Sequence, residues 1–170
     1  MTIDADLALI LEVAREAGEL AAGLRRRGLS VSYKEGDSPV TNADLAADAH
    51  LFDRLRAARP DYGWLSEETA DSPDRLGRSR VFVVDPVDGT RAFLKNRPWW
   101  AVSVAVVEDG RPVAGVVYAP DLAETYAASE GGGATLNGQP IQASQRRELE
   151  GCGMVGDERL FRHPAWRRPW

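Results

Sequence analysis

Apolar residues recur at steps of three and four positions in two stretches near the start of the chain. The first covers residues 4–27 and ends at Gly28, a residue typical of the position after a helix. The second follows Thr41, whose hydroxyl suits an N-cap, with Asp44 at the third helical position, and it ends near Pro60. Its apolar stripe reads Leu45, Ala46, Ala49, Phe52 and Leu55. The spacing predicts two amphipathic helices.

Runs rich in β-branched and aromatic residues lie between and after these helices. They predict strands at residues 31–33, 63–66, 80–84, 101–107, 113–118 and about 125–128. Pro86 and Gly89 break the third run after residue 84, and Asp109-Gly110, a pair typical of hairpin turns, joins the next two. Polar loops or turns are predicted at residues 34–39, 71–79, 131–133 and 137–138. This order predicts an α+β fold of layered helices and an antiparallel sheet.

Size and charge limit what the chain can bind. Its 170 residues, 44% hydrophobic and 28% charged, suit a compact domain. The net charge of -5 and the pI near 5.1 give no general attraction to nucleic acid or to an anionic membrane. No apolar run approaches the about 20 residues of a membrane span, and the start lacks the basic region of a signal peptide. We therefore expect a cytoplasmic protein whose partners include no nucleic-acid polymer and no membrane.

The segment DPVDGT, residues 85–90, carries two carboxylates where a predicted strand ends. Asp85 and Asp88 could point into one cavity, and hard cations prefer such oxygen ligands. Gly89 and Thr90 offer backbone N–H groups to a phosphate where a short helix could begin. An ordinary turn is the alternative, because Asp, Pro and Gly are all turn residues.

Further acids lie upstream of this segment. Glu67 and Glu68 end an apolar run, where they are costly unless water or a cation compensates them. A solvated strand end is the alternative for this pair. If the fold gathers them with Asp44, Asp85 and Asp88, the carboxylates would repel one another without a metal, so a divalent-cation site is the simpler interpretation.

Three segments resemble, in order, the amino-terminal motifs of the inositol monophosphatase superfamily: DSPVTNAD at 37–44, LSEE at 65–68 and VDPVDGT at 84–90. Residues 102–120 and 131–138 also match its pattern, so the resemblance extends to about residue 144. It implies the amino-terminal domain of the inositol monophosphatase and sugar phosphatase fold over residues 1–150, binding metal and phosphate.

The resemblance also implies a metal set. Glu67, Asp85 and the carbonyl of Val87 would hold a first magnesium ion, and Asp85 with Asp88 would bridge to a second. A complete site of this family holds two or three magnesium ions, and inhibition by lithium is expected. Glu68 would lie next to the metal ligands without binding the metal itself.

The remaining roles implied by the resemblance concern water and substrate. Thr90, paired with Asp44, would orient the attacking water and help to deprotonate it, and Glu67 is counted with them as catalytic. The amides of Gly89 and Thr90 would hold the phosphate. Arg91 could contact a second phosphate, or be a solvated cation beside an acidic site. Lys34 would lie near the metal site, although a lone loop lysine is more often solvated.

One family feature is missing from the sequence. The family carries another metal-binding aspartate in a Trp-Asp motif of a carboxy-terminal α/β domain, and no Trp-Asp pair occurs in this chain. We therefore expect that domain to be absent, residues 151–170 to be its truncated start, and the chain to be a fragment.

The expected activity is magnesium-dependent hydrolysis of a small phosphorylated metabolite. SPVT at 38–41, LSEE at 65–68 and GVVYAP at 115–120 are most similar to bacterial 3'(2'),5'-bisphosphate nucleotidases, which favours conversion of adenosine 3',5'-bisphosphate to AMP. Inositol-1-phosphate is an alternative substrate, and so is histidinol phosphate, because DGTRAF at 88–93 resembles histidinol-phosphate phosphatases. A catalytically inactive metal-binding fragment is the alternative of another class. The family is often dimeric, so a homodimer is possible.

Overall fold

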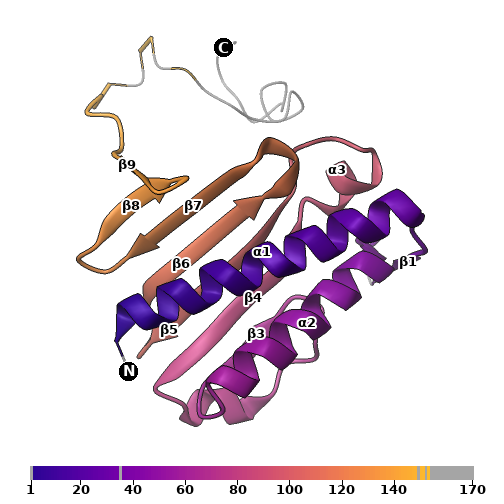
Figure 1. The fold of residues 1–170 in the computed structure, drawn as a ribbon, viewed down its shortest axis with the longest axis horizontal. Helices are drawn as coiled ribbons and strands as arrows, with labels where there is room; N and C mark the ends of the chain where they lie inside the picture. The colour runs from indigo at the N-terminus through magenta and orange to yellow at the C-terminus, as the bar shows by residue number, and fades with distance from the viewer. Residues whose placement is uncertain (1, 35, 149, 152, 154–170) are drawn as a thin grey trace.

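Two long helices lie side by side across one face of a seven-stranded sheet (Figure 1). The computed structural model describes residues 2–34, 36–148, 150, 151 and 153. α1 spans Ile3–Arg27 and α2 spans Asn42–Ala58. Thr2 caps α1, and Thr41 with Asp44 forms the predicted capping box of α2. Both predicted helices are therefore confirmed.

The sheet is mixed. Its strands follow in the order β3 Gly63–Ser66, β4 Arg80–Asp88, β5 Ala101–Glu108, β6 Arg111–Ala119, β7 Glu124–Ser129, β8 Gly133–Leu136 and β9 Gln139–Ile141. β3 and β4 pair in parallel, and every later neighbour pairs antiparallel. A separate two-stranded sheet joins β1 Val31–Tyr33 to β2 Pro39–Thr41. The predicted α+β class is confirmed, although the first pair of the large sheet is not antiparallel.

Several local predictions were wrong. β4 does not end before Pro86 but continues to Asp88. Its pairing with β5 shifts register between Asp85 and Asp88, so the proline lies where the ladder is already interrupted. Turns are found at 131–132 and 137–138, close to the predicted 131–133 and 137–138, but the strands β8 and β9 beside them were not predicted. The predicted loop 71–79 contains a short 3-10 helix, Pro73–Gly77.

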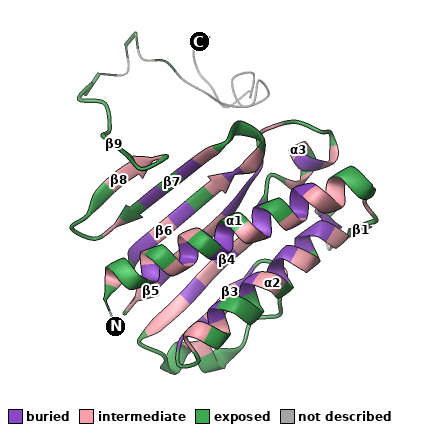
Figure 2. Cartoon of the chain, viewed as in Figure 1, coloured by how far each residue is buried: buried purple, intermediate pink, exposed green. Residues whose placement is uncertain are grey.

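The helices and the sheet share one core (Figure 2). α1 packs against it with small residues, which let the helix lie close to β5 and β6. The buried stripe of α2 is Ala43, Ala47, Leu51 and Leu55. Of the predicted stripe only Leu55 is in this core cluster, while Leu45 and Phe52 are exposed. The stripe was misassigned because the helix buries two acids, Asp44 and Asp48, beside its alanines.

A buried ionic cluster joins the amino-terminal end of α1 and the carboxy-terminal end of α2 to the sheet. The Asp6 carboxylate, with no exposed surface, accepts hydrogen bonds from Arg59 Nε at 2.8 Å, Arg80 Nη1 at 2.7 Å and Tyr62 OH at 2.8 Å. Three donors on different elements compensate this charge, as a buried carboxylate requires. None of the helices described is long and apolar enough to cross a membrane.

The approach of α1 to the sheet gives a stability prediction. A Cβ atom at Gly18 would lie 2.7 Å from the Tyr118 ring and 2.9 Å from Pro120 Cγ. Because the helix must move away to relieve this overlap, we expect Gly18→Ala to lower the free energy of unfolding by about 1–3 kcal/mol in urea titrations.

Gly23 is the matched control on the same helix. The nearest atom that a Cβ would meet there is 3.8 Å away, so Gly23→Ala should stabilise the protein by up to about 1 kcal/mol. Equal stabilisation by both substitutions would contradict the close packing inferred at Gly18.

Candidate active site

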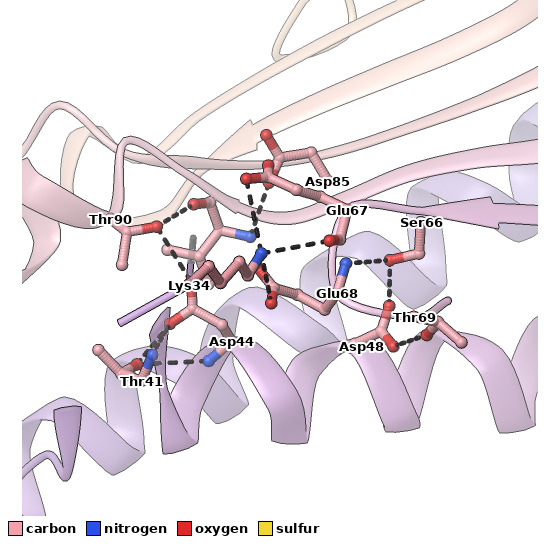
Figure 3. Close-up of polar contacts among 11 residues, drawn as sticks. Lys34, Thr41, Asp44, Asp48, Ser66, Glu67, Glu68, Thr69, Asp85 and Thr90 are labelled. Carbon is pink, nitrogen blue, oxygen red and sulfur yellow. Dashed lines mark hydrogen bonds and ion pairs between the residues drawn. The ribbon is translucent and has the colours of Figure 1, made fainter. Parts of the chain in front are cut away.

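The parallel pair β3–β4 brings two separate acidic segments to one edge of the sheet. Ser66 lies opposite Val84, and Glu67 N continues the pairing by donating to Val84 O at 3.2 Å. Parallel strands end on the same side, so the residues after Ser66 lie beside Asp85 (Figure 3). The structure therefore brings together the acids that the sequence predicted to form one site.

Asp85 is the electrostatic centre of this edge. The pKa of the Asp85 carboxyl is raised to about 7, mainly by burial and in addition by the negative charges of Glu67 and Asp88. The hydrogen bond from Val87 N at 3.1 Å opposes the shift but does not cancel it. A half-buried carboxylate surrounded by like charge is a position where a cation would bind favourably.

Lys34 supplies positive charge on one side of the cluster. Its ammonium lies 2.7 Å from Glu68 Oε2 and 3.8 Å from Glu67 Oε1, and it donates to the Glu67 carbonyl at 3.2 Å. Burial raises the pKa of the Glu68 carboxyl, whose side chain is 5% exposed, although the bond to Lys34 lowers it. Glu68 is therefore held by Lys34, while Glu67 stays half exposed and available.

Thr90 and Asp44 form the predicted pair. The Thr90 hydroxyl lies 3.0 Å from Asp44 Oδ1 and 3.0 Å from the Val87 carbonyl, and its single proton serves one of them at a time. Asp44 is 1% exposed, and its other oxygen accepts from the backbone and hydroxyl of Thr41. The capping box thus fixes the carboxylate that contacts Thr90.

Gly89 makes the turn that leads from β4 into the short helix α3, Thr90–Leu94. Its φ of 85° is left-handed, and a Cβ would lie 2.7 Å from the carbonyl of Trp99. Both the conformation and the close approach require glycine at this position. Thr90 consequently starts α3 directly beside Val87 and Asp44.

Arg91, the predicted substrate contact, lies at the rim of this turn. Its Nη2 donates to the Asp37 carbonyl at 2.7 Å, so the guanidinium holds the loop between β1 and β2. Contact with a substrate phosphate stays a prediction.

Asp48, which was not predicted as a site residue, holds the acidic turn, residues 66–69 after β3. Its carboxylate accepts from the hydroxyls of Ser66 and Thr69, and Ser66 Oγ in turn accepts from Glu68 N at 3.2 Å. Asp48 lies four residues after Asp44, on the same face of α2, and that spacing was the available signal.

The residues present fit a hard divalent cation. Glu67, Asp85, Asp88 and the Val87 carbonyl provide only oxygen donors, the ligands that magnesium and calcium prefer. Within the described residues, no three acidic, imidazole or thiol side chains already stand arranged to hold a metal. The charges of Glu67 and Asp88 nevertheless act on Asp85, and the Glu67 side chain, which already contacts Asp85, is half exposed.

Comparison with known proteins identifies the family. The model described as the inositol monophosphatase family matches residues 4–168. The chain belongs to the inositol monophosphatase family. A histidinol-phosphatase of Chlorobaculum parvum is 38% identical over 157 residues, covering 92% of this chain and 60% of the relative. The 3'(2'),5'-bisphosphate nucleotidase CysQ of Salmonella typhimurium is 40% identical over 125 residues, covering 72% and 51% respectively.

Solved structures agree with this membership. The extragenic suppressor protein suhB from Bartonella henselae superposes with a TM-score of 0.80 at 36% identity, over 87% of this chain and 58% of that structure. An inositol monophosphatase from Thermotoga maritima gives 0.80 at 34% identity, over 87% and 57%. The chain thus spans 60% or less of these relatives and has the amino-terminal domain of the inositol monophosphatase fold. The predicted second segment, 151–170, lies outside the described residues apart from 151 and 153.

The Asp48 network gives the next prediction. Removing its carboxylate leaves the Ser66 and Thr69 hydroxyls without their acceptor, so Asp48→Ala should lower the free energy of unfolding by about 1–3 kcal/mol. Asp48→Asn keeps one acceptor oxygen and should cost less. Asp53→Ala changes an exposed acid of the same helix and should stay within about 0.5 kcal/mol of the wild type. Equal losses for Asp48→Ala and Asp53→Ala in urea unfolding would refute this role.

Proposed function

We propose that this protein is a metal-dependent phosphomonoesterase that hydrolyses a small phosphorylated metabolite with a metal-activated water. The observation that supports it most is Asp85, half-buried between like charges, beside the hydrogen-bonded pair of Thr90 and Asp44. Relatives named as histidinol-phosphatase, bisphosphate nucleotidase and inositol-1-monophosphatase agree in the reaction class but not in substrate. Adenosine 3',5'-bisphosphate remains our preferred substrate within that class.

Glu67, Asp85, Asp88 and the Val87 carbonyl would hold magnesium in this proposal. A bound ion would supply a water of lowered pKa and neutralise charge on the phosphate. If Val87 O were a metal ligand, Asp44 Oδ1 would be the acceptor for the Thr90 proton. The Thr90 oxygen could then accept a proton from the attacking water while the Thr90 proton passes to Asp44.

The turn at Gly89 and Thr90 would place the phosphate. The left-handed Gly89 turns the chain from β4 into α3, which would present the amides of Gly89 and Thr90 to the phosphate. Arg91 would contribute a cation at the rim if a second phosphate displaced its contact with the Asp37 carbonyl. A substrate with two phosphates should therefore depend on Arg91 more than one with a single phosphate.

Removal of the metal ligands tests the proposal directly. We expect magnesium-dependent phosphate release from adenosine 3',5'-bisphosphate, inositol-1-phosphate or histidinol phosphate, abolished by a chelator and restored by magnesium. Asp85→Asn should lower turnover by at least about 100-fold, because the amide cannot balance a cation as the carboxylate does. Asp53→Asn, which changes an exposed acid on α2, should leave turnover unchanged. No release from any of the three esters would instead favour an inactive metal-binding chain.

Thr90 separates water activation from metal binding. Thr90→Ala should lower turnover by about 100-fold while changing the magnesium affinity, measured by calorimetry, by less than about threefold. Thr90→Ser keeps the hydroxyl and should retain most of the activity. Equal loss of turnover and magnesium affinity would move Thr90 into the set of metal ligands.

A further inference from the structure

The guanidinium of Arg25 lies at the end of α1 and contacts the elements that follow the Gly89 turn. Its Cζ atom is 4.8 Å from the centre of the Phe93 ring and 5.3 Å from that of Trp100. Its Nη2 lies 2.7 Å from both carboxylate oxygens of Asp121. The side chain is only 13% exposed, so these contacts are shielded from water and correspondingly strong.

Asp121 and the two rings complete a closed cluster around Arg25. Trp100 Nε1 donates to Asp121 Oδ2 at 2.9 Å. The Phe93 and Trp100 rings meet edge to face, with centroids 4.6 Å apart, and both residues are at most 2% exposed. Four side chains from α1, α3, the loop before β5 and the turn after β6 therefore fix one another.

This cluster holds the Gly89 turn on two sides. On one side, the Phe93 and Ala92 amides donate to Gly89 O at 3.0 Å and 2.8 Å. On the other, Gly89 packs against the backbone of Trp99 and Trp100. If Phe93 or Trp100 moved, Gly89 and the adjoining Thr90 would therefore move as well.

We propose that Arg25 is a positioning residue that fixes the Gly89–Thr90 turn by holding Phe93 and Trp100 against it. It does so from α1, far from the turn in the sequence, through the described contacts with Phe93, Trp100 and Asp121. The expected effect on turnover rests on the proposed function, in which Gly89 and Thr90 place the phosphate and the water. The structural role of Arg25 does not rest on that function.

Hydrogen–deuterium exchange measures the structural role without any assay of activity. In Arg25→Met, the amides of Ala92 and Phe93 should exchange about tenfold faster, because local opening of the turn becomes easier. Amides of β5 and β6, in the middle of the sheet, should change by less than about twofold. Arg25→Lys keeps the charge for Asp121 but stacks less well on the rings, so it should give an intermediate rate.

Two further variants keep the test decisive. Arg27→Met removes an exposed arginine two residues away and should leave the turn unchanged. Trp100→Phe keeps an aromatic ring but removes the Nε1 donor and the five-membered part of the indole that packs in this cluster. It can be measured even if Arg25→Met does not fold, and it should also accelerate exchange of the Ala92 and Phe93 amides selectively. A uniform increase over the whole sheet, or no increase at these two amides, would overturn the proposal.

Turnover provides a second measurement, independent of hydrogen–deuterium exchange. If the wild type hydrolyses a phosphate ester, Arg25→Met should lower kcat by about tenfold while changing magnesium affinity by less than about twofold. Faster local exchange with an inactive wild type would refute the proposed function and leave the positioning role intact. If the wild type is active but Arg25→Met leaves the exchange of these two amides unchanged, the positioning role is refuted and the proposed function stands.

Discussion

The parallel pairing of β3 with β4 is the constraint on which the candidate site depends. In an antiparallel pair, the residues after Ser66 and those after Val84 would leave the sheet at opposite ends. Parallel strands end together, so Glu67 and Asp85 meet although 17 residues of chain separate them in sequence order, from 68 to 84. The register shift between Asp85 and Asp88 then lets β4 carry Pro86 and turn at Gly89. All residues assigned to metal or phosphate binding lie at the ends of these two strands or directly after them.

The same helix that completes the core also supports the site. α2 buries Ala47, Leu51 and Leu55 against the sheet, and on an adjoining face its first two turns carry Asp44 and Asp48. Asp44 is shared between the helix cap and Thr90, and Asp48 is shared between Ser66 and Thr69. Folding of the helix therefore sets the positions of the acidic turn and of the Thr90 hydroxyl at once.

The ionic cluster around Asp6 and the acidic cluster around Asp85 show how differently buried charge is used. Asp6 accepts from three donors on neighbouring elements and joins both helices to β4 and to Tyr62, just before β3. Among the described residues, Asp85 accepts from the amide of Val87 and is surrounded by the like charges of Glu67 and Asp88, and the pKa of its carboxyl is raised. A cluster with complete compensation stabilises the fold, whereas one without it is suited to a cation from solution.

Local chemistry in the sequence determined much of this protein. Apolar spacing and capping residues predicted α1 and the start of α2, and valine-rich runs with Asp109-Gly110 predicted the central hairpin, because these signals act within a few residues. The motifs at 37–44, 65–68 and 84–90 also indicated which acids belong together. The sequence did not determine the parallel β3–β4 pair, the strands β8 and β9, the buried face of α2 or the roles of Asp48 and Arg25. These depend on contacts between residues far apart in the chain: Asp48 meets Ser66 across 18 positions, and Arg25 meets Asp121 across 96. Only the tertiary structure decides such contacts, because the free energy of pairing distant side chains exists only once the helices and the sheet have packed.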